Sequence, residues 1–304
     1  MSRTATEARH EKAVGLDARP PREILALLAS GQQAAAAAVE AAIPDLEAGA
    51  ELVAQAIRSG GKLVYAGAGS SGLMAMADAL ELPGTYGIAK EQIVILLAGG
   101  VSSLTDLAGA PEDDVEQACK DAAIVEPGDC VICVSASGST PSALAIAEEA
   151  RRRGAKVVAL ANNPGAGLFA HADVSILLQT PPEVIAGSTR MGAGTAQKIA
   201  FNMLSTLAGV KLGHVHDGHM VNLYPDNEKL RARAARMVSE IAGIEDAAAT
   251  RLLETAAGSV KVAVLLASGA PDADAARAAL ARSGDALRPA IAEFNEQHGF
   301  HKRA

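Results

Sequence analysis

The stretch Lys62-Leu-Val-Tyr-Ala-Gly-Ala-Gly-Ser-Ser-Gly72 decides the fold. Residues 63–65 are apolar and read as a short buried strand. The Gly-Ala-Gly run at residues 67–69 lets the backbone turn sharply, and Ser70 and Ser71 stand where a helix begins. A helix start offers unpaired N–H groups and the positive end of the helix dipole. Residues 67–72, the first serine loop, therefore predict an anion-binding turn between a strand and a helix.

The glycine spacing of this loop also matches Gly-x-Gly-x-x-Gly, a weak indication of a dinucleotide site. A dinucleotide site needs a carboxylate at the end of the second strand, about 20 residues on, to hold the ribose. The second strand is predicted at residues 93–97 and ends in Ala98-Gly99-Gly100, without a carboxylate. Two hydroxyls beside free N–H groups suit a single terminal phosphate better. A Gly-rich turn without a ligand stays open as an alternative.

Composition narrows the class of protein. The chain has 304 residues, of which 49% are hydrophobic and 2% aromatic, so we expect a core of Ala, Leu, Val and Ile. The net charge of −8 argues against a nucleic-acid partner. The first residues are polar, and no apolar run reaches the roughly 18 residues of a membrane span. We therefore expect neither a signal peptide nor a membrane partner.

The three cysteines, Cys119, Cys130 and Cys133, fit a reduced cytoplasmic protein. Cys130 and Cys133 have CxxC spacing, but they lie within a predicted strand and have no second pair. We interpret them as core residues and predict no metal site at this motif.

Strand and helix patterns alternate along the chain. Helical patterns cover residues 22–59 and 193–210, and short helices follow from about residue 230. Strands are predicted at residues 62–66, 93–97, 130–134, 156–161 and 174–178. This alternation predicts an α/β fold: a parallel sheet flanked by helices on both faces, with a small C-terminal helical subdomain. We expect an N-terminal helical segment at 1–60, a central domain at 61–234 and the helical subdomain at 235–304.

A second serine loop, residues 135–140, again follows a strand and opens a helix at Pro141. It carries the hydroxyls of Ser135, Ser137, Ser139 and Thr140. One such loop could be an ordinary capping motif. Two of them after parallel strands are more specific, because ligands gather at the carboxyl ends of such strands. The two loops together predict a site for a phosphorylated small molecule.

These loops resemble the phosphosugar-binding loops of the sugar isomerase (SIS) domain. Four further stretches are similar to the N-acetylmuramic acid 6-phosphate etherase family: residues 81–87, 187–198, 202–206 and 227–230. The resemblance begins at Thr6 and covers nearly the whole chain. It implies a SIS-type fold, a homodimer, and a cytoplasmic lyase of amino-sugar metabolism and peptidoglycan recycling. Its substrate would be a phosphorylated amino sugar, and it would use no metal and no other cofactor.

The resemblance also assigns residues. Glu81 and Glu112 would be the catalytic acid and base for cleaving the D-lactyl ether, by elimination and then water addition. The substrate would be bound by eight further residues: Ser70, Ser71, Ser135, Ser137, Ser139, Thr140, Glu183 and Ser188. Some relatives bind phosphosugars without turnover, so a phosphosugar-binding regulator is one alternative function. A SIS-type phosphosugar isomerase is the other.

The surroundings of the two glutamates suggest their roles. Glu81 lies between Leu80 and Leu82, and apolar neighbours raise the pKa of a carboxyl, which suits the acid. Glu112 lies at a predicted helix start, which favours the ionised form and suits the base. The roles could be reversed. Glu112 could also be a capping acid, and Glu81 a surface carboxylate at a helix end.

Three histidines, His214, His216 and His219, fall close together with Asp217 nearby. The corresponding family position has no such triplet and uses no metal. Histidines in a loop are more often solvated, although SIS dimers can place a histidine in the neighbour's site. We do not assign these three residues to catalysis.

Two positions depart from the family pattern: Leu73 and Ser139 stand where arginines are usual. Arginine holds carboxylates and phosphates with paired, charge-assisted hydrogen bonds. The phosphate can stay on the serines, but the lactyl carboxylate loses a partner unless Arg190 or a partner subunit supplies one. We therefore expect poor turnover of N-acetylmuramic acid 6-phosphate, or a preference for a smaller or uncharged C3 substituent.

The double variant Leu73→Arg/Ser139→Arg should raise kcat/KM for N-acetylmuramic acid 6-phosphate, because it restores positive charge beside both loops. Steady-state kinetics of the wild type and this variant provide the measurement. A wild type already as active as ordinary family members, with no gain from the arginines, would contradict the expectation.

Overall fold

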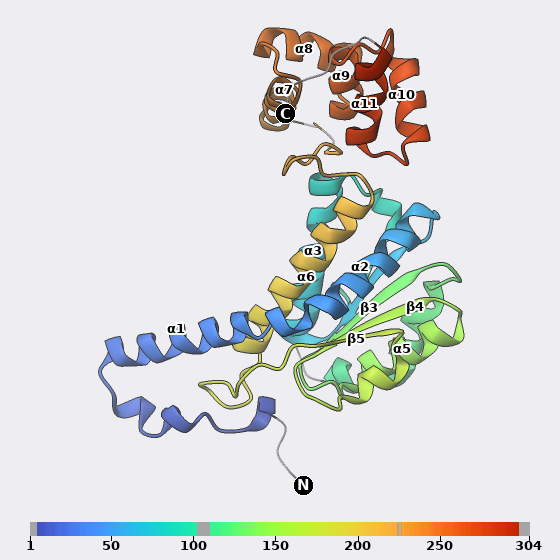
Figure 1. Ribbon diagram of the computed structural model, residues 1–304. Helices are drawn as coiled ribbons and strands as arrows, with labels where there is room; N and C mark the ends of the chain where they lie inside the picture. Colours follow the sequence, from blue (N-terminus) through green and yellow to red (C-terminus); the bar gives the residue numbers. More distant parts are fainter. Residues whose placement is uncertain (1–4, 102–109, 224, 226, 298–304) are drawn as a thin grey trace. The chain divides into compact units, whose positions relative to one another are not determined.

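The computed structural model describes residues 5–101, 110–223, 225 and 227–297 (Figure 1). By internal contacts the chain divides into two units. The first unit comprises residues 1–80 and 90–207, and the second comprises residues 81–89 and 208–304. The division at residues 61 and 235 stays a prediction.

The first unit contains a five-stranded parallel sheet in the order β2-β1-β3-β4-β5. The order reverses direction between β1 and β3, so the chain builds the sheet outward on both sides of this pair. Every strand expected from the sequence is present, which confirms the predicted parallel sheet. The strands are β1 (Leu63–Gly67), β2 (Ile93–Leu97), β3 (Cys130–Ser135), β4 (Lys156–Ala161) and β5 (Val174–Leu177).

Helices cover both faces of the sheet, as predicted (Figure 1). Successive strand residues point to opposite faces. Val64 and Ala66 pack in one cluster with α4 and α5, whereas the Tyr65 ring lies 5.9 Å from the Phe201 ring of α6 on the other face. The helices of this part of the chain are α1 (Pro21–Ala37), α2 (Ile43–Arg58), α3 (Gly69–Tyr86), α4 (Val115–Asp121), α5 (Pro141–Arg152) and α6 (Gly192–Lys211).

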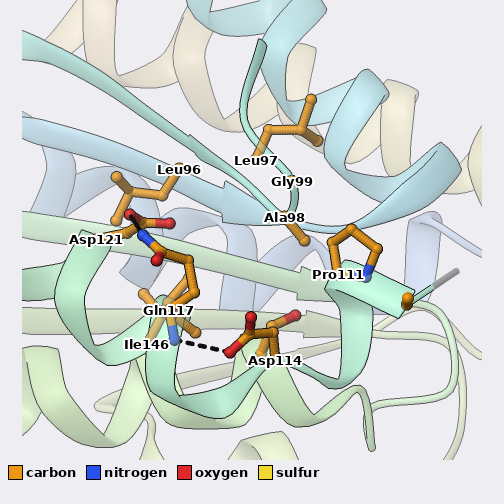
Figure 2. Close-up of a pocket in the computed structure, with 12 residues that line it drawn as sticks. Leu96, Leu97, Ala98, Gly99, Pro111, Asp114, Gln117, Asp121 and Ile146 are labelled. Atoms are coloured by element: carbon orange, nitrogen blue, oxygen red, sulfur yellow. Dashed lines mark hydrogen bonds between the residues drawn. The ribbon is translucent and has the colours of Figure 1, made fainter. Parts of the chain in front are cut away.

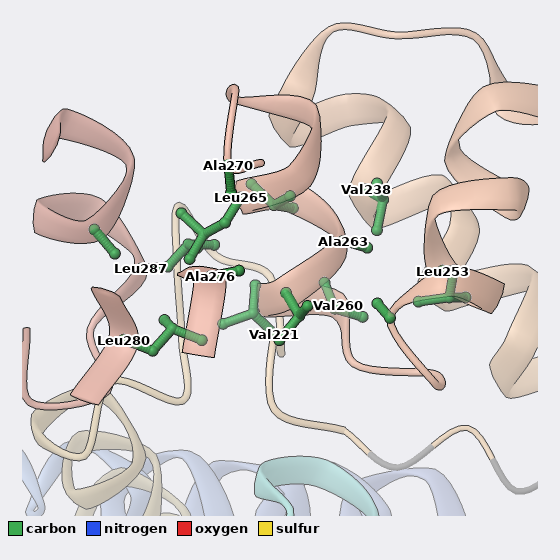
Figure 3. Packing of buried hydrophobic residues seen from close by; sticks show 14 of the residues in the cluster. Val221, Val238, Leu253, Val260, Ala263, Leu265, Ala270, Ala276, Leu280 and Leu287 are labelled. Atoms are coloured by element: carbon green, nitrogen blue, oxygen red, sulfur yellow. The ribbon is translucent and has the colours of Figure 1, made fainter. Parts of the chain in front are cut away.

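The described residues of the second unit form five helices of their own, which confirms the predicted C-terminal helical subdomain. Its apolar core gathers around α9, whose Val260, Ala263 and Leu265 are buried among residues of the neighbouring helices (Figure 3). The helices are α7 (Glu228–Ala242), α8 (Asp246–Thr255), α9 (Val260–Ala267), α10 (Ala273–Arg282) and α11 (Leu287–Gln297).

Cys130 and Cys133 are fully buried core residues of β3, as the sequence predicts. Burial raises the pKa of the Cys133 thiol to about 12. Both thiols are therefore held in the neutral, unreactive form. Cys119 is exposed, and all three thiols are free.

One helical stretch among the described residues, Pro21–Arg58, has the length and hydropathy of a membrane span. It consists of α1, a 3₁₀ turn and α2. The α2 part buries Leu46 and Val53 in the first unit, as a core helix of a globular domain does. That no segment spans a membrane stays a prediction.

A buried carboxylate ties α3 to β1 and α6. Asp78 is 6% exposed and accepts hydrogen bonds from the Tyr65 hydroxyl (2.8 Å), the Asn202 amide (2.7 Å) and the Ser205 hydroxyl (3.1 Å). Within the described residues Tyr65 donates to Oδ2, whereas Asn202 and Ser205 both donate to Oδ1. Burial and the neighbouring Asp78 raise the pKa of Tyr65 well above its usual value, so its proton stays in place as a donor.

Tyr65→Phe should lower the free energy of unfolding by about 1–3 kcal/mol, because it leaves one oxygen of a buried carboxylate without its donor. Ser205→Ala is the matched control. It should cost only about 0.5–1.5 kcal/mol, because Asn202 still donates to the same oxygen. Urea unfolding followed by circular dichroism measures both values, and equal losses in the two variants would contradict this account.

Candidate active site

The two serine loops lie next to each other at the carboxyl edge of the sheet. Gly67 at the end of β1 pairs with Val134 of β3, so both loops leave the sheet at the same level. They flank the point where the strand order reverses, and ligands of open parallel sheets bind at this switch point. The register of two central strands thus brings together serines that are about 65 positions apart in the chain.

The first serine loop depends on a close contact between Gly67 and Gly72. A Cβ atom on Gly72 would lie 2.9 Å from the carbonyl oxygen of Gly67, and one on Gly67 would lie 3.1 Å from the Gly72 Cα. Side chains at these positions would push the start of α3 away from β1. The helix begins at Gly69, so Ser70 and Ser71 lie in its first turn. There the unpaired helix N–H groups can hold an anion.

The second serine loop gathers its hydroxyls around Ser135 and Ser137. The Ser135 hydroxyl lies 2.8 Å from that of Thr140 and 3.2 Å from that of Ser137. It accepts the Gly138 N–H at 3.0 Å, and Ser137 accepts the Ser139 hydroxyl at 3.0 Å. A tight left-handed turn at Gly138, with φ of +73°, makes this convergence possible. The cluster opens α5 at Pro141, as predicted.

Glu112 lies against the first serine loop. A Cβ atom built on Gly69 would lie 2.7 Å from its Oε1 atom. Burial raises the pKa of the Glu112 carboxyl, and the negative charge of Asp113 raises it further. We expected a helix start to stabilise the ionised form of Glu112, and this expectation is wrong because its pKa is raised. Glu112 belongs to a 3₁₀ turn, Ala110–Asp113, and Asp114 caps α4 by accepting the Gln117 N–H at 2.9 Å.

A cavity of about 270 Å³ lies beside the turn that carries Glu112. Figure 2 shows it between the end of β2, with Leu97 and Ala98, and the segment before α4, where Pro111 lies in the 3₁₀ turn and Asp114 caps the helix. The cavity is large enough for a small polar substituent, and Asp114 and Gln117 give it a polar side. The start of α5 contributes Ser142.

Glu81 lies inside α3, which continues past Pro83 to Tyr86. Its side chain is exposed, and so is Leu80, at 64%. The expectation that apolar residues surround the Glu81 carboxyl is therefore wrong, although the neighbouring Leu82 is buried. Glu81 belongs to the second unit and Glu112 to the first.

Glu183 is buried and caps α6. Its two carboxylate oxygens accept the N–H groups of Gly192 (2.9 Å) and Ala193 (2.8 Å). A carboxylate at this position stabilises the helix start. The loop between Glu183 and α6 carries Ser188, which is partly buried. A sugar contact by either residue stays a prediction.

Two residues beside the serine loops were missed in the sequence. Asn163, the second residue after β4, donates its side-chain N–H to the carbonyl of Ala136 at 3.2 Å. Thr6, from the N-terminal 3₁₀ turn Ala5–Glu7, donates its backbone N–H to Asn163. The signal for Asn163 was its position after a strand, where ligands gather. Thr6 lies 157 residues from its partner, and no local pattern marks such a pair.

The three histidines lie in the segment of the second unit that follows α6, and two of them form a tight turn. His216 and His219 exchange backbone hydrogen bonds across Asp217 and Gly218, both of which have positive φ. The His219 ring lies 3.6 Å from the Glu240 carboxylate. Burial lowers the pKa of His214 to about 4, so it stays neutral near pH 7. Among the described residues, no three or more His, Cys, Asp or Glu side chains gather as a metal site.

Comparison with known proteins places this geometry in a family. A model of the SIS domain matches residues 28–162. N-acetylmuramic acid 6-phosphate etherase of Symbiobacterium thermophilum is 44% identical over 266 residues, which are 87% of this chain and 89% of that protein. The etherase of Deinococcus radiodurans is 42% identical, over 86% of each chain. That of Geobacillus thermodenitrificans is 39% identical, over 88% of this chain and 91% of its own. With SIS-type serine loops and this similarity over most of its length, the chain belongs to the N-acetylmuramic acid 6-phosphate etherase family.

Proposed function

We propose that this protein is a carbon–oxygen lyase that cleaves the D-lactyl ether of N-acetylmuramic acid 6-phosphate. The observation that carries the proposal is the meeting of two serine loops at the switch point of the sheet, with the Glu112 carboxylate against the first loop. This arrangement offers an anion site next to an acid–base group, which a phosphorylated substrate with an acidic C–H bond requires.

The reaction consists of an elimination and an addition. In the open-chain sugar the C1 aldehyde makes the C2 proton acidic, and a base removes it. The C2–H electrons form a C2=C3 double bond, the C3–O bond breaks, and an acid protonates the departing lactate oxygen. Water then adds across C2=C3, with its hydroxyl on C3 and a proton on C2. The products are N-acetylglucosamine 6-phosphate and D-lactate.

The phosphate lies between the two serine loops in this proposal. It accepts hydrogen bonds from the hydroxyls of the loops and from the N–H groups at the starts of α3 and α5. Convergence of the second-loop hydroxyls on Ser135 and Ser137 supports this assignment. The proposed phosphate ligands are Ser70, Ser71, Ser135, Ser137, Ser139 and Thr140.

We assign Glu112 as the base and Glu81 as the acid. The raised pKa of Glu112 makes its carboxylate a stronger proton acceptor than an ordinary one. Exposure of Glu81 leaves it free to exchange protons with water. Ser188 is assigned to the sugar. Glu183 is assigned a supporting role, because its carboxylate holds the start of α6 after the loop that carries Ser188.

We further propose that the enzyme is a cytoplasmic homodimer. Helix α1 supports a dimer, because Ala35 is its one buried residue and Leu25 is 65% exposed. A second copy of the chain would remove this apolar surface from water. Three free cysteines suit a reducing compartment. A monomer in sedimentation at micromolar concentration would contradict the dimer.

The direct test of the activity is incubation of the purified protein with N-acetylmuramic acid 6-phosphate and an enzymatic assay for D-lactate. Release of lactate with catalytic turnover supports the lyase. Tight binding without lactate would favour a phosphosugar-binding regulator. Interconversion of an aldose and a ketose phosphate, without lactate, would indicate an isomerase.

Ser137→Ala should weaken the binding of N-acetylglucosamine 6-phosphate. Loss of a hydrogen bond to a charged group costs about 1.5–3 kcal/mol, which corresponds to roughly tenfold to a hundredfold in Kd. Ser175→Ala is the matched control, because Ser175 lies within β5 of the same sheet but away from the loops. Isothermal titration calorimetry measures both. Unchanged binding in Ser137→Ala and in Ser135→Ala would place the phosphate elsewhere.

The two glutamates can be separated by their single variants. Glu81→Gln should stop lactate release but leave the exchange of the C2 proton with solvent largely intact, because the base is still present. Glu112→Gln should abolish both. Exchange is followed by proton NMR in deuterated water, and lactate by its assay. Equal loss of exchange in both variants would contradict these roles.

The pH profile supplies a control for Glu112 as the base. A base works when deprotonated, so kcat/KM should fall at low pH as Glu112 is protonated. The charge of Asp113 raises the pKa of Glu112. Asp113→Asn removes this charge and should move the acidic limb to lower pH, whereas Asp113→Glu should leave it in place. If the acidic limb of the kcat/KM profile stays at the same pH in Asp113→Asn, it reports the titration of a group other than Glu112.

A further inference from the structure

Thr6 is fastened to Asn163 by two reciprocal hydrogen bonds. Its backbone N–H donates to Oδ1 of Asn163 at 3.3 Å, and its hydroxyl oxygen accepts from Nδ2 at 2.8 Å. Both side chains are almost completely buried, with Thr6 3% and Asn163 2% exposed. Buried amides and hydroxyls of this kind hold each other in one orientation, because any rotation would leave a polar atom unpaired.

The same Asn163 amide also donates hydrogen bonds to the second serine loop. Its Nδ2 lies 3.2 Å from the carbonyl oxygen of Ala136 and 3.4 Å from that of Ser137. These two carbonyls flank the side chain of Ser137, whose hydroxyl contacts those of Ser135 and Ser139. The Asn163 amide therefore helps to hold the peptide groups on either side of the Ser137 side chain, together with the Asn162 backbone N–H, which donates to the Ala136 carbonyl at 3.1 Å.

Thr6 reaches a second part of the site through its backbone. Its carbonyl accepts the N–H of Gly187 at 3.2 Å, one residue before Ser188. The 3₁₀ turn Ala5–Glu7 thus connects the second serine loop to the loop that precedes α6. One N-terminal residue is thus connected to two of the regions to which the proposed function assigns substrate contacts: to the second serine loop through Asn163, and to the loop that carries Ser188 through Gly187.

We infer that Thr6 is a positioning residue for the phosphate site, acting through Asn163 on Ser137. Within the described residues the Thr6 hydroxyl is the nearest acceptor of the Asn163 Nδ2 group. Without it the amide can rotate, its hold on the Ala136 and Ser137 carbonyls loosens, and the Ser137 hydroxyl is no longer held in place for the anion. The inference rests on the proposed phosphate site between the serine loops.

The chain contains a matched pair that separates positioning from simple stability. Asn162 and Thr180 form the same kind of contact, with Nδ2 of Asn162 donating to the Thr180 hydroxyl at 3.3 Å. Thr180 is 3% exposed, the same as Thr6. The other side-chain partners of Asn162 in the described chain are the Leu178 carbonyl and the Gln197 amide, neither of which belongs to a serine loop.

The experiment compares Thr6→Val with Thr180→Val in the full chain. Valine keeps the shape of threonine and removes the hydroxyl. Both variants should lose thermal stability to a similar degree. Thr6→Val should raise KM for N-acetylmuramic acid 6-phosphate about tenfold, and the Kd of N-acetylglucosamine 6-phosphate to the same degree, with a smaller change in kcat. Thr180→Val should leave both constants unchanged. Thr6→Ser, which keeps the hydroxyl, should bind both sugars as the wild type does.

Equal KM values in the two valine variants, whether raised or unchanged, would overturn the inference, as would a fall in kcat alone. If Thr6→Val does not fold, Thr6→Ser against Thr6→Ala provides the same comparison with and without the hydroxyl. Ser137→Ala separates the role of Thr6 from the existence of the phosphate site. Weaker binding in Ser137→Ala with normal binding in Thr6→Val refutes the role of Thr6 alone. Normal binding in both refutes the phosphate site.

Discussion

The pairing of β1 with β3 is the constraint on which the candidate site depends. Gly67 lies opposite Val134, and this register sets the level at which both strands end and the two serine loops begin. A slip of one residue would turn the buried side chains of β1 to the opposite face, so the two apolar layers enforce the register. The packing of the core therefore sets the relative position of the two serine loops, which need no direct contact with each other. The same arrangement leaves the starts of α3 and α5 pointing toward one region at the edge of the sheet.

Packing against this pair of strands then fixes the remaining groups of the first unit. Glycines at residues 67 and 72 bring the start of α3 against β1, and Asp78 locks the next turns of that helix to Tyr65 and α6. Burial near the first loop also sets the chemistry of Glu112, whose pKa rises as its carboxyl leaves water. Stability and acid–base function thus share a cause in these residues, since both follow from the exclusion of water beside the loops.

Much of the fold could be predicted from local patterns. The five strands, the Pro141 start of α5 and the helical second unit each follow from periodicity and from Gly and Pro signals. The end of α3 is harder to predict, because proline usually ends or kinks a helix, yet α3 continues three residues past Pro83 to Tyr86. Pro83 has no N–H to donate to the carbonyl four residues before it, so this turn of α3 holds without one of its regular hydrogen bonds.

The candidate site could be predicted in part. Its serines follow strands and are visible in the sequence, whereas the surroundings of Glu112, the capping by Glu183 and the Thr6–Asn163 pair depend on contacts between distant segments. Asp114, next to two other acids, takes the helix cap for which Glu112 was the alternative candidate. In a run of three acids, composition cannot tell which carboxylate caps the helix and which turns toward the loop.

A crystal structure of the protein with N-acetylglucosamine 6-phosphate tests the central claim most directly. The account predicts the phosphate between the two serine loops, within hydrogen-bond distance of Ser71 and Ser137, with the sugar directed toward the Glu112 carboxylate. A phosphate bound away from the switch point of the sheet, or a sugar that leaves Glu112 out of reach of its C2 atom, would contradict it.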